Sequence, residues 1–241
     1  MRLKKIISCI LILFSSALWA ETLTVSTIEG SPVSDIASLI LQEIYNRAGL
    51  ELNVFPMPAL RATVESTGGN IDGETHRVLS YGTKHPELIL VSEPYYSIET
   101  VLFTQKDNPA LQADKESLTQ YSISILKGVV KAFELTKDYR EVIEFDTSDQ
   151  MMQFLSLRRT DFALLSRLNG ISVINRLGIR GLVTYSPPLE ITILYHYLHM
   201  SHSDLVPLLE KTIRELRDSG ELEEISARAE TRVMGRIMSS H

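Results

Sequence analysis

The stretch 23–55, LTVSTIEGSPVSDIASLILQEIYNRAGLELNVF, contains a strand, a helix and a second strand. Leu23–Ile28 alternates apolar and polar residues in the manner of a half-buried strand. Ser34 and Asp35 offer N-caps for the helix that follows, and Leu50–Phe55 has the pattern of the next strand. A β-α-β unit of this kind predicts a parallel sheet with helices on its faces.

The same order of elements recurs further along the chain. After a polar stretch, Thr104–Asp114, which we interpret as a linker or crossover, strands and helices alternate again from Ser122 to Tyr185. A long strand is predicted near Ile191–Leu198, followed by a helix from about Ser203. The sequence therefore predicts two α/β lobes joined by two crossings: lobe 1, residues 21–102 and 190–241, and lobe 2, residues 103–189.

Residues 1–20 have the pattern of a secretory signal peptide. Met1–Lys5 is basic, Ile6–Trp19 is mostly apolar, and Ala20 is a small residue before a polar one. An uncleaved membrane anchor is the alternative, although the apolar run is short for a membrane span. Cys9, the single cysteine, lies inside this run, so the mature chain has no disulfide and no cysteine–metal site. We predict a periplasmic protein.

The net charge of the mature chain limits the classes of molecule that it can bind. Without residues 1–20 the chain keeps 21 basic against 30 acidic side chains, a net charge of −9. Such a surface repels nucleic acid and anionic lipid, which excludes both as partners. No phosphate-binding glycine loop and no G-x-S-x-G nucleophile motif occurs. We predict a monomer without a cofactor.

Five short motifs, in this order, resemble those of the extracellular solute-binding proteins of the amino-acid-binding type, family 3. They are Gly69–Asp72 ("G-x-[VI]-D"), Val91–Tyr96 ("F-S-x-P-Y-Y"), Leu118–Gly128, Arg159–Leu165 and the closing helix Leu205–Leu222. Together they extend over nearly all of the mature chain. The resemblance implies a two-lobed periplasmic-binding-protein fold of type II, which closes on a small ligand by bending at the two crossings.

The residues that hold an amino acid in that family are different in this chain. His85 stands where the family has the arginine that pairs with the ligand's α-carboxylate, and Ser166 stands where it has the aspartate for the α-amino group. The loop that usually offers Gly-Ser/Thr donors reads Gly128-Val-Val-Lys131. An imidazole cannot replace the bidentate bond of a guanidinium to a carboxylate. We therefore expect a small, polar, anionic or zwitterionic ligand other than a standard free α-amino acid.

Other charged residues fill the same region of lobe 1. Arg61 opens the helix after Phe55–Pro58, and Glu74 and Arg77 follow Asp72, where the family places hydrogen-bonding serines. Two arginines and a glutamate can bind an anion or a zwitterion. The alternative is that Glu74 and Arg77 form an ordinary surface pair. If Arg77 binds the ligand, its replacement by alanine is expected to abolish binding while leaving the fold intact.

Five more residues complete the predicted ligand site. Tyr95 and Tyr195 lie near the two crossings, where each can either line the cleft or pack in the core. Lys127, Gly128 and Ser166 would close on the ligand from lobe 2, and a solvated Lys127 is the alternative for that residue.

Three functions remain open at this level. The resemblance implies a binding protein that presents its ligand to an ABC-type importer; a periplasmic sensor that docks on a membrane signalling receptor is the alternative. A dehydratase-like enzyme would need Glu74 as an acid with a raised pKa, which nearby arginines would lower, so we predict no enzyme. A metal site at His196-x-x-His199-x-x-His202 is disfavoured, because residues three apart on a strand point to opposite faces.

Overall fold

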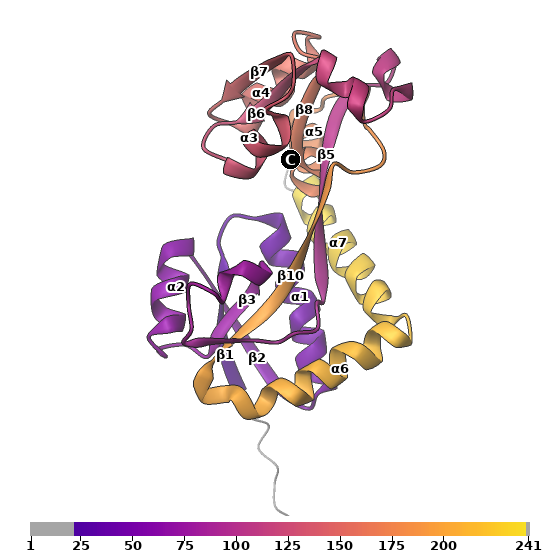
Figure 1. The fold of residues 1–241 in the computed structure, drawn as a ribbon. Helices are drawn as coiled ribbons and strands as arrows, with labels where there is room; N and C mark the ends of the chain where they lie inside the picture. The colour runs from indigo at the N-terminus through magenta and orange to yellow at the C-terminus, as the bar shows by residue number, and fades with distance from the viewer. Residues whose placement is uncertain (1–21, 240–241) are drawn as a thin grey trace, which may run out of the picture.

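The computed structural model describes residues 22–239, so the predicted signal peptide lies outside the described residues. Figure 1 shows two α/β bodies, one above the other, joined by two long strands that cross between them. We call the lower body lobe 1 and the upper body lobe 2; the exact ranges given above stay a prediction. The predicted fold class, a two-lobed α/β architecture, is confirmed.

One curled sheet runs through both bodies in the strand order β2-β1-β3-β10-β5-β8-β6-β7, while β4 pairs with β10 and β9 pairs with β5. Strands β5 and β10 are antiparallel neighbours and form the two crossings. The strands are β1 Thr22–Ile28, β2 Glu51–Met57, β3 Gly73–Arg77, β4 Leu88–Leu90, β5 Tyr96–Gln105, β6 Ser122–Leu126, β7 Glu141–Phe145, β8 Phe162–Ser166, β9 Leu182–Thr184 and β10 Glu190–His199.

Helices cover the sheet in both lobes (Figure 1). The α-helices are α1 Pro32–Arg47, α2 Ala59–Thr67, α3 Val130–Thr136, α4 Ser148–Ser156, α5 Arg167–Leu177, α6 Val206–Asp218 and α7 Glu221–Ser239. The 3-10 turns are η1 Leu79–Tyr81, η2 Pro109–Gln112, η3 Glu116–Gln120 and η4 Met200–Leu205. The helix expected from about Ser203 begins at Val206, because η4 occupies the residues before it.

Helix α1 begins earlier than the predicted caps. Its N-cap is Ser31, whose hydroxyl accepts a hydrogen bond from the backbone N–H of Ser34 at 3.4 Å. Pro32 occupies the first helical turn, where its fixed φ suits a helix and its missing N–H costs nothing. The prediction of Ser34 or Asp35 as the cap was therefore wrong, and Asp35 lies in the first turn instead.

Strand β5 is longer than the sequence pattern indicated. Thr104 and Gln105, assigned to a polar crossover, are buried strand residues at its end. The Thr104 hydroxyl donates to the carbonyl of Asp161 at 2.7 Å, and the Gln105 amide donates to the carbonyl of Leu155 at 2.9 Å. Because backbone carbonyls satisfy both side chains, these polar residues are tolerated inside lobe 2.

Each lobe has its own core. The lobe 1 core packs α1, α6 and α7 against β1 and its neighbours, with Ile36, Ile40, Leu209 and Ile213 fully buried. Two clusters in lobe 2 lie around Phe162 and around Phe103. Helix α7 runs from the base of lobe 1 along the crossings, and its end contacts α5 of lobe 2 (Figure 1).

Among residues 22–239, no helix combines the length and apolar composition that a membrane span requires.

Candidate functional site

The carboxyl ends of the parallel strands of both lobes define the cleft. Strands β1, β2 and β3 are parallel and end at Ile28, Met57 and Arg77, so these ends share one edge of lobe 1. In lobe 2 the parallel strands β6 and β8 end at Leu126 and Ser166. In open α/β sheets, ligands bind beside such strand ends.

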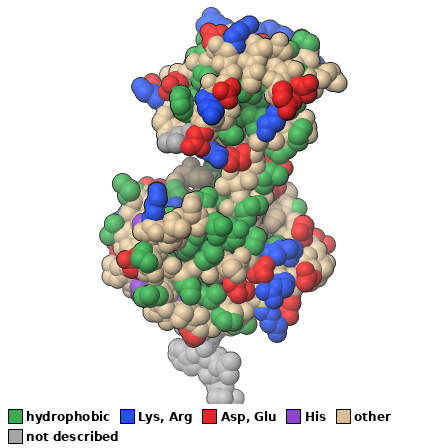
Figure 2. Space-filling model, in the orientation of Figure 1, with side chains coloured by type: hydrophobic (Ala, Val, Ile, Leu, Met, Phe, Trp, Pro, Cys, Tyr) green, Lys and Arg blue, Asp and Glu red, His purple; other side chains and the backbone are tan. Residues whose placement is uncertain are grey.

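A hollow of about 590 Å³ lies between these edges. Gly30, Ser31 and Asp35 line it from lobe 1, and Leu126 and Asn169 are among the residues that line it from lobe 2. The surface is indented between the two bodies in Figure 2. Burial raises the pKa of Asp35, an effect that the positive charge of Arg236 partly offsets.

Glu74 and Arg77 form a buried ion pair on the lobe 1 side. The carboxylate of Glu74 is 1% exposed, and its Oε2 pairs with Nη2 of Arg77. Its Oε1 accepts hydrogen bonds from Ser66 Oγ at 2.8 Å and from the Tyr81 hydroxyl at 2.5 Å. The alternative of a solvated surface pair is therefore wrong, and Glu74 itself has no free oxygen for a ligand.

The side chain of Arg77 is 12% exposed, in contrast to the buried carboxylate of Glu74 with which it pairs. Its guanidinium lies over the ring of Tyr81, 4.8 Å from the ring centre, and its Nε is buried without a hydrogen-bond partner among the described residues. An arginine carries five N–H donors in a rigid fork, of which Glu74 uses only part. Burial and the hydrogen bond to Glu74 raise the pKa of Tyr81, so this ring stays a neutral donor.

A register shift in the pairing of β3 with β10 places the side chains of Glu74 and Arg77 on the same face of the sheet. Tyr197 of β10 pairs with Glu74 of β3, and Tyr195 pairs with Arg77, so an interval of two residues on β10 faces an interval of three on β3. An extra residue in one strand reverses the alternation of faces beyond it. Glu74 and Arg77 can therefore meet although residues three apart on a regular strand point to opposite faces.

A neutral histidine of β10 is hydrogen-bonded to the backbone of β3 at this pairing. His196 is fully buried, with Nδ1 at 2.8 Å from the carbonyl oxygen of Glu74 and Nε2 at 2.8 Å from the hydroxyl of Tyr45. Since a carbonyl can only accept, Nδ1 carries the proton and Nε2 accepts from Tyr45. Burial lowers the pKa of His196 to about 4, so the ring is uncharged at neutral pH.

The three histidines of the H-x-x-H-x-x-H pattern have separate partners. His199 Nδ1 lies 2.7 Å from Ser201 Oγ, and His202 Nε2 lies 2.8 Å from Asp72 Oδ1. In the part of the chain that the structure describes, no three histidine, cysteine, aspartate or glutamate side chains are grouped closely enough to hold a metal ion.

The other lobe 1 candidates are dispersed. Tyr95 is 2% exposed and donates its hydroxyl to the carbonyl of Thr75 at 2.8 Å, so it packs in the core. Arg61 is an exposed side chain on α2 that pairs with Glu65 at 3.5 Å. Tyr195 is half-buried and lies directly across the strand pair from Arg77. The structure therefore brings Tyr195 to Arg77 and leaves Tyr95 and Arg61 apart from it.

The lobe 2 candidates lie where β6 and β8 end. Lys127 and Gly128 are exposed, and Gly128 has a φ of +78°, a conformation that favours glycine. Ser166 caps α5, with its hydroxyl accepting from the backbone N–H of Asn169 at 3.4 Å. Ser166 also lines a smaller cavity of about 240 Å³ in the lobe 2 face of the cleft.

Several lining residues were missed by sequence reasoning. Ser31, Asp35 and Asn169 line the inter-lobe hollow from the beginning of a helix that follows a strand, and Ser172 lines it from the middle of α5. That position is readable in a sequence, since the first turn of each such helix faces the same edge as the strand ends. Ile237 of α7 lines the hollow too, and no motif indicated that the last helix reaches it.

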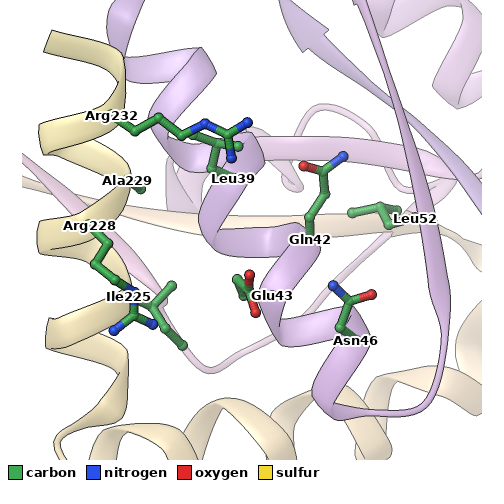
Figure 3. A pocket seen from close by; sticks show the side chains of 9 residues that line it. All are labelled: Leu39, Gln42, Glu43, Asn46, Leu52, Ile225, Arg228, Ala229 and Arg232. Atoms are coloured by element: carbon green, nitrogen blue, oxygen red, sulfur yellow. The ribbon is translucent and has the colours of Figure 1, made fainter. Parts of the chain in front are cut away.

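Another hollow, of about 420 Å³, lies outside the cleft. Figure 3 shows that α1 and α7 both line it: Glu43 of α1 lies toward α7, which carries Arg228 and Arg232, while Gln42 lies on the other side of α1. It lies between two helices on the flank of lobe 1, away from the strand ends. We therefore place the candidate site in the cleft.

The cleft between two crossed lobes is the geometry of a known class of fold. The probable amino-acid ABC transporter extracellular-binding protein YtmK of Bacillus subtilis has a similar structure, with a TM-score of 0.70 at 14% identity, over 87% of this chain and 97% of that one. This chain has the fold of the periplasmic binding proteins. A histidine kinase sensor domain with similarity to periplasmic binding proteins also matches, with a TM-score of 0.59 at 14% identity, over 87% and 95% of the two chains.

Sequence comparison is less informative than structural comparison. No protein-family model matches the sequence. An uncharacterized protein of Shewanella oneidensis is 24% identical over 202 residues, which are 80% of this chain and 75% of the relative.

Proposed function

We propose that this protein is a periplasmic solute-binding protein that captures a small anionic or zwitterionic ligand between its lobes and presents it to an ABC-type importer. The observation that carries the proposal is Arg77, which ends β3, is held by the buried carboxylate of Glu74, and keeps a side chain that is 12% exposed. The likeness to an ABC-transporter binding protein supports the importer as the partner.

Arg77 suits this role because its position is fixed before the ligand arrives. Glu74 holds one nitrogen of the guanidinium, and the ring of Tyr81 supports its face. A preorganised fork loses little conformational entropy when it binds a carboxylate, and a charge-assisted bidentate bond is stronger than a neutral one. In this proposal Glu74 positions Arg77, and the ligand contacts Arg77 and Tyr195.

Lobe 2 completes the site when the cleft closes. Lys127, Gly128 and Ser166 lie at the ends of β6 and β8 and supply backbone and side-chain donors. Strands β5 and β10 are the only two strands that join the lobes among residues 22–239, so closure bends the molecule there. Ligand binding is then measurable as a movement of one lobe toward the other.

A catalytic role for Glu74 is not part of the proposal. Both carboxylate oxygens of Glu74 already have partners in Ser66, Tyr81 and Arg77. A general acid must reach the atom that it protonates, and a carboxylate that is 1% exposed does not reach the cleft.

A thermal-shift screen of residues 22–239 tests the proposed function. The compounds are carboxylates, α-amino acids, neutral sugars and polyamines. A ligand at a hundredfold excess over its Kd stabilises by about 2.7 kcal/mol, which raises the Tm of a chain of this size by roughly 5–10 °C. We expect shifts from carboxylates or zwitterions only; shifts from sugars or polyamines alone would contradict the proposal.

The matched variant is the double substitution Glu74→Gln/Arg77→Met, which removes both charges and keeps the side chains close to their original size. It is expected to fold and to show no shift with the same ligands. Arg61→Met, at an exposed arginine of α2, is the control and should keep the shift.

A sensor function is the second candidate, supported by the likeness to a histidine kinase sensor domain. In this case the closed protein would dock on a membrane receptor in place of a permease. Co-purification of the ligand-loaded protein with membranes that contain either the permease or the receptor distinguishes the two partners.

A further inference from the structure

The lobe 2 face of the cleft contains a cavity whose wall is mostly aliphatic. Its volume is about 240 Å³. The aliphatic side chains come from β6, β8, α3 and the N-cap residue of α3, namely Leu126, Val129, Ala132, Leu135, Leu164 and Leu165. A cavity with such a wall binds an apolar group and excludes a charged one, because a charge loses its hydration there without gaining a partner.

This cavity adjoins the larger hollow between the lobes. The residues Leu126, Leu165 and Asn169 line both the cavity and the larger hollow, so the two spaces are neighbours. The larger hollow is lined on the lobe 1 side by Gly30 and the residues after it. Strand β3 pairs in parallel with β1, with Glu74 opposite Ser26, and the two strands end at Arg77 and at Ile28, at the same edge of lobe 1 as Gly30. One small molecule can therefore contact both lobes.

The one cation of the cavity wall is already paired. The ammonium of Lys131 lies 2.8 Å from Glu190 Oε1, and this hydrogen bond raises the pKa of Lys131. The other oxygen of Glu190 is buried without a hydrogen-bond partner among the described residues. The described residues that line the cavity therefore offer no unpaired cation to a second carboxylate on the ligand.

Apolar surface also remains uncovered at the mouth of the cavity. Val129 is 45% exposed and Phe133 is 60% exposed, and both line an adjoining hollow that shares Leu126 and Val129 with the cavity. Closure of the lobes on an apolar group would remove these side chains from water, which favours the closed state.

We propose that the ligand carries one anionic group, bound by Arg77, and an apolar group that occupies the cavity between α3, β6 and β8. This inference rests on the proposed function and narrows its ligand to monoanions or zwitterions with a branched aliphatic or single-ring tail. The two lobes then divide the recognition: lobe 1 holds the charge, and lobe 2 selects the tail.

Calorimetric titration with four simple carboxylates tests the division. 3-Phenylpropionate and 4-methylpentanoate carry an apolar tail, glutarate carries a second charge, and acetate carries neither. Each buried methylene contributes a factor of about four in affinity. We expect the two tailed monocarboxylates to bind at least tenfold more tightly than acetate and glutarate.

A filled cavity provides the matched control. Ala132→Leu places extra carbon atoms in the cavity, while Ala227→Leu makes the same change on the exposed side of α7. We expect Ala132→Leu to weaken 3-phenylpropionate at least tenfold relative to Ala227→Leu. If that variant does not fold, the four-ligand series with the unsubstituted protein still decides the question.

The outcomes separate the two proposals. Equal or tighter binding of glutarate or acetate overturns the apolar-tail inference and leaves the proposed function standing. Unchanged affinity of 3-phenylpropionate in a folded Ala132→Leu variant overturns it as well. If none of the four carboxylates binds while the thermal-shift screen finds another carboxylate or an α-amino acid without an apolar tail, the inference is overturned and the proposed function stands. If neither experiment finds a ligand, both are contradicted.

Discussion

At the residue scale, the buried ion pair of Glu74 and Arg77 determines which of the two residues is available to a ligand. The spacing of the two residues suggested either a ligand contact or a weak surface pair. For Glu74 neither description fits, because this residue is 1% exposed. A buried charge is stable only when it is paired and hydrogen-bonded, and Ser66, Tyr81 and Arg77 satisfy that condition for Glu74. The pair therefore belongs to the fold as well as to the site.

This burial changes the expectation for Arg77→Ala. The substitution leaves the carboxylate of Glu74 buried without its counter-charge, which is expected to destabilise the protein by about 3–5 kcal/mol. The double variant Glu74→Gln/Arg77→Met leaves no orphaned charge and should lose far less. Urea unfolding of the three proteins measures the difference, and a single variant as stable as the unsubstituted protein would show that the carboxylate is not sequestered.

Two buried histidines predict a dependence of stability on pH. Burial lowers the pKa of His76 and of His196 to about 4, with Arg77 adding to the effect at His76. Their usual pKa is 6.5, so between pH 6.5 and 4 the unfolded chain binds protons that the folded chain does not. Their contribution is complete above pH 6.5 and falls with the pH, by about 3 kcal/mol per histidine at pH 4.

The variant His196→Gln isolates one of the two groups. Glutamine can replace both hydrogen bonds, to Tyr45 and to the carbonyl of Glu74, but does not titrate. Urea unfolding from pH 4.5 to 7.5 should then show a shallower loss of stability toward acid than in the unsubstituted protein. The same slope in both proteins would mean that His196 is already protonated in the folded state.

At the element scale, the contact between α5 and β5 depends on a glycine. A Cβ atom built at Gly170 would lie 2.1 Å from the ring of Phe103, which is fully buried. Gly170→Ala must displace this ring and is expected to cost about 1–3 kcal/mol. Gly235 lies in α7 with open space around it, so Gly235→Ala should stabilise by about 0.5–1 kcal/mol.

Thermal unfolding of the two glycine variants checks this packing. The expected result is a lower Tm for Gly170→Ala and an equal or higher Tm for Gly235→Ala. A loss of stability of the same size in both would contradict the close approach of α5 to β5.

Most elements could be predicted from sequence, and the exceptions have physical causes. The alternation of strands and helices survives in the structure because each element buries one apolar face. Helix α1 begins at Pro32, earlier than predicted, because the fixed φ of proline suits the first turn of a helix and Ser31 caps it. Thr104 and Gln105 have a polar composition, but backbone carbonyls in lobe 2 make them part of β5.

The site was less predictable than the elements. The position of Arg77 depends on a slip in the pairing of β3 with β10, which contacts distant in sequence determine. Tyr95 was an open choice between cleft and core, and its hydroxyl meets the carbonyl of Thr75 in the core. The lobe 2 cavity is formed by aliphatic residues of three elements, and such residues have no motif that separates a cavity wall from a packed core.

At the scale of the whole molecule, the two lobes were predictable because the β-α pattern restarts near Ser122 after the first crossing. The path of α7 could not be predicted from the sequence. This helix begins in the lobe 1 core and ends against α5 of lobe 2, so it accompanies the two crossings. Tyr96 of β5 donates to Glu230 of α7 at 2.9 Å, which ties the helix to the crossing itself.

The central claim is that a carboxylate bound at Arg77 closes the cleft, and an inter-lobe distance tests it most directly. The described residues contain no cysteine, so Lys84→Cys in lobe 1 and Lys137→Cys in lobe 2 accept spin labels selectively at two exposed positions. The distance is measured alone, with a pool of monocarboxylates and α-amino acids, and with a pool of neutral sugars.

We predict that the carboxylate pool shortens the mean distance by several ångströms, that the sugar pool does not, and that Glu74→Gln/Arg77→Met abolishes the shortening. A distance that no pool changes, or that shortens equally in the double variant, would contradict capture of an anion by closure on Arg77.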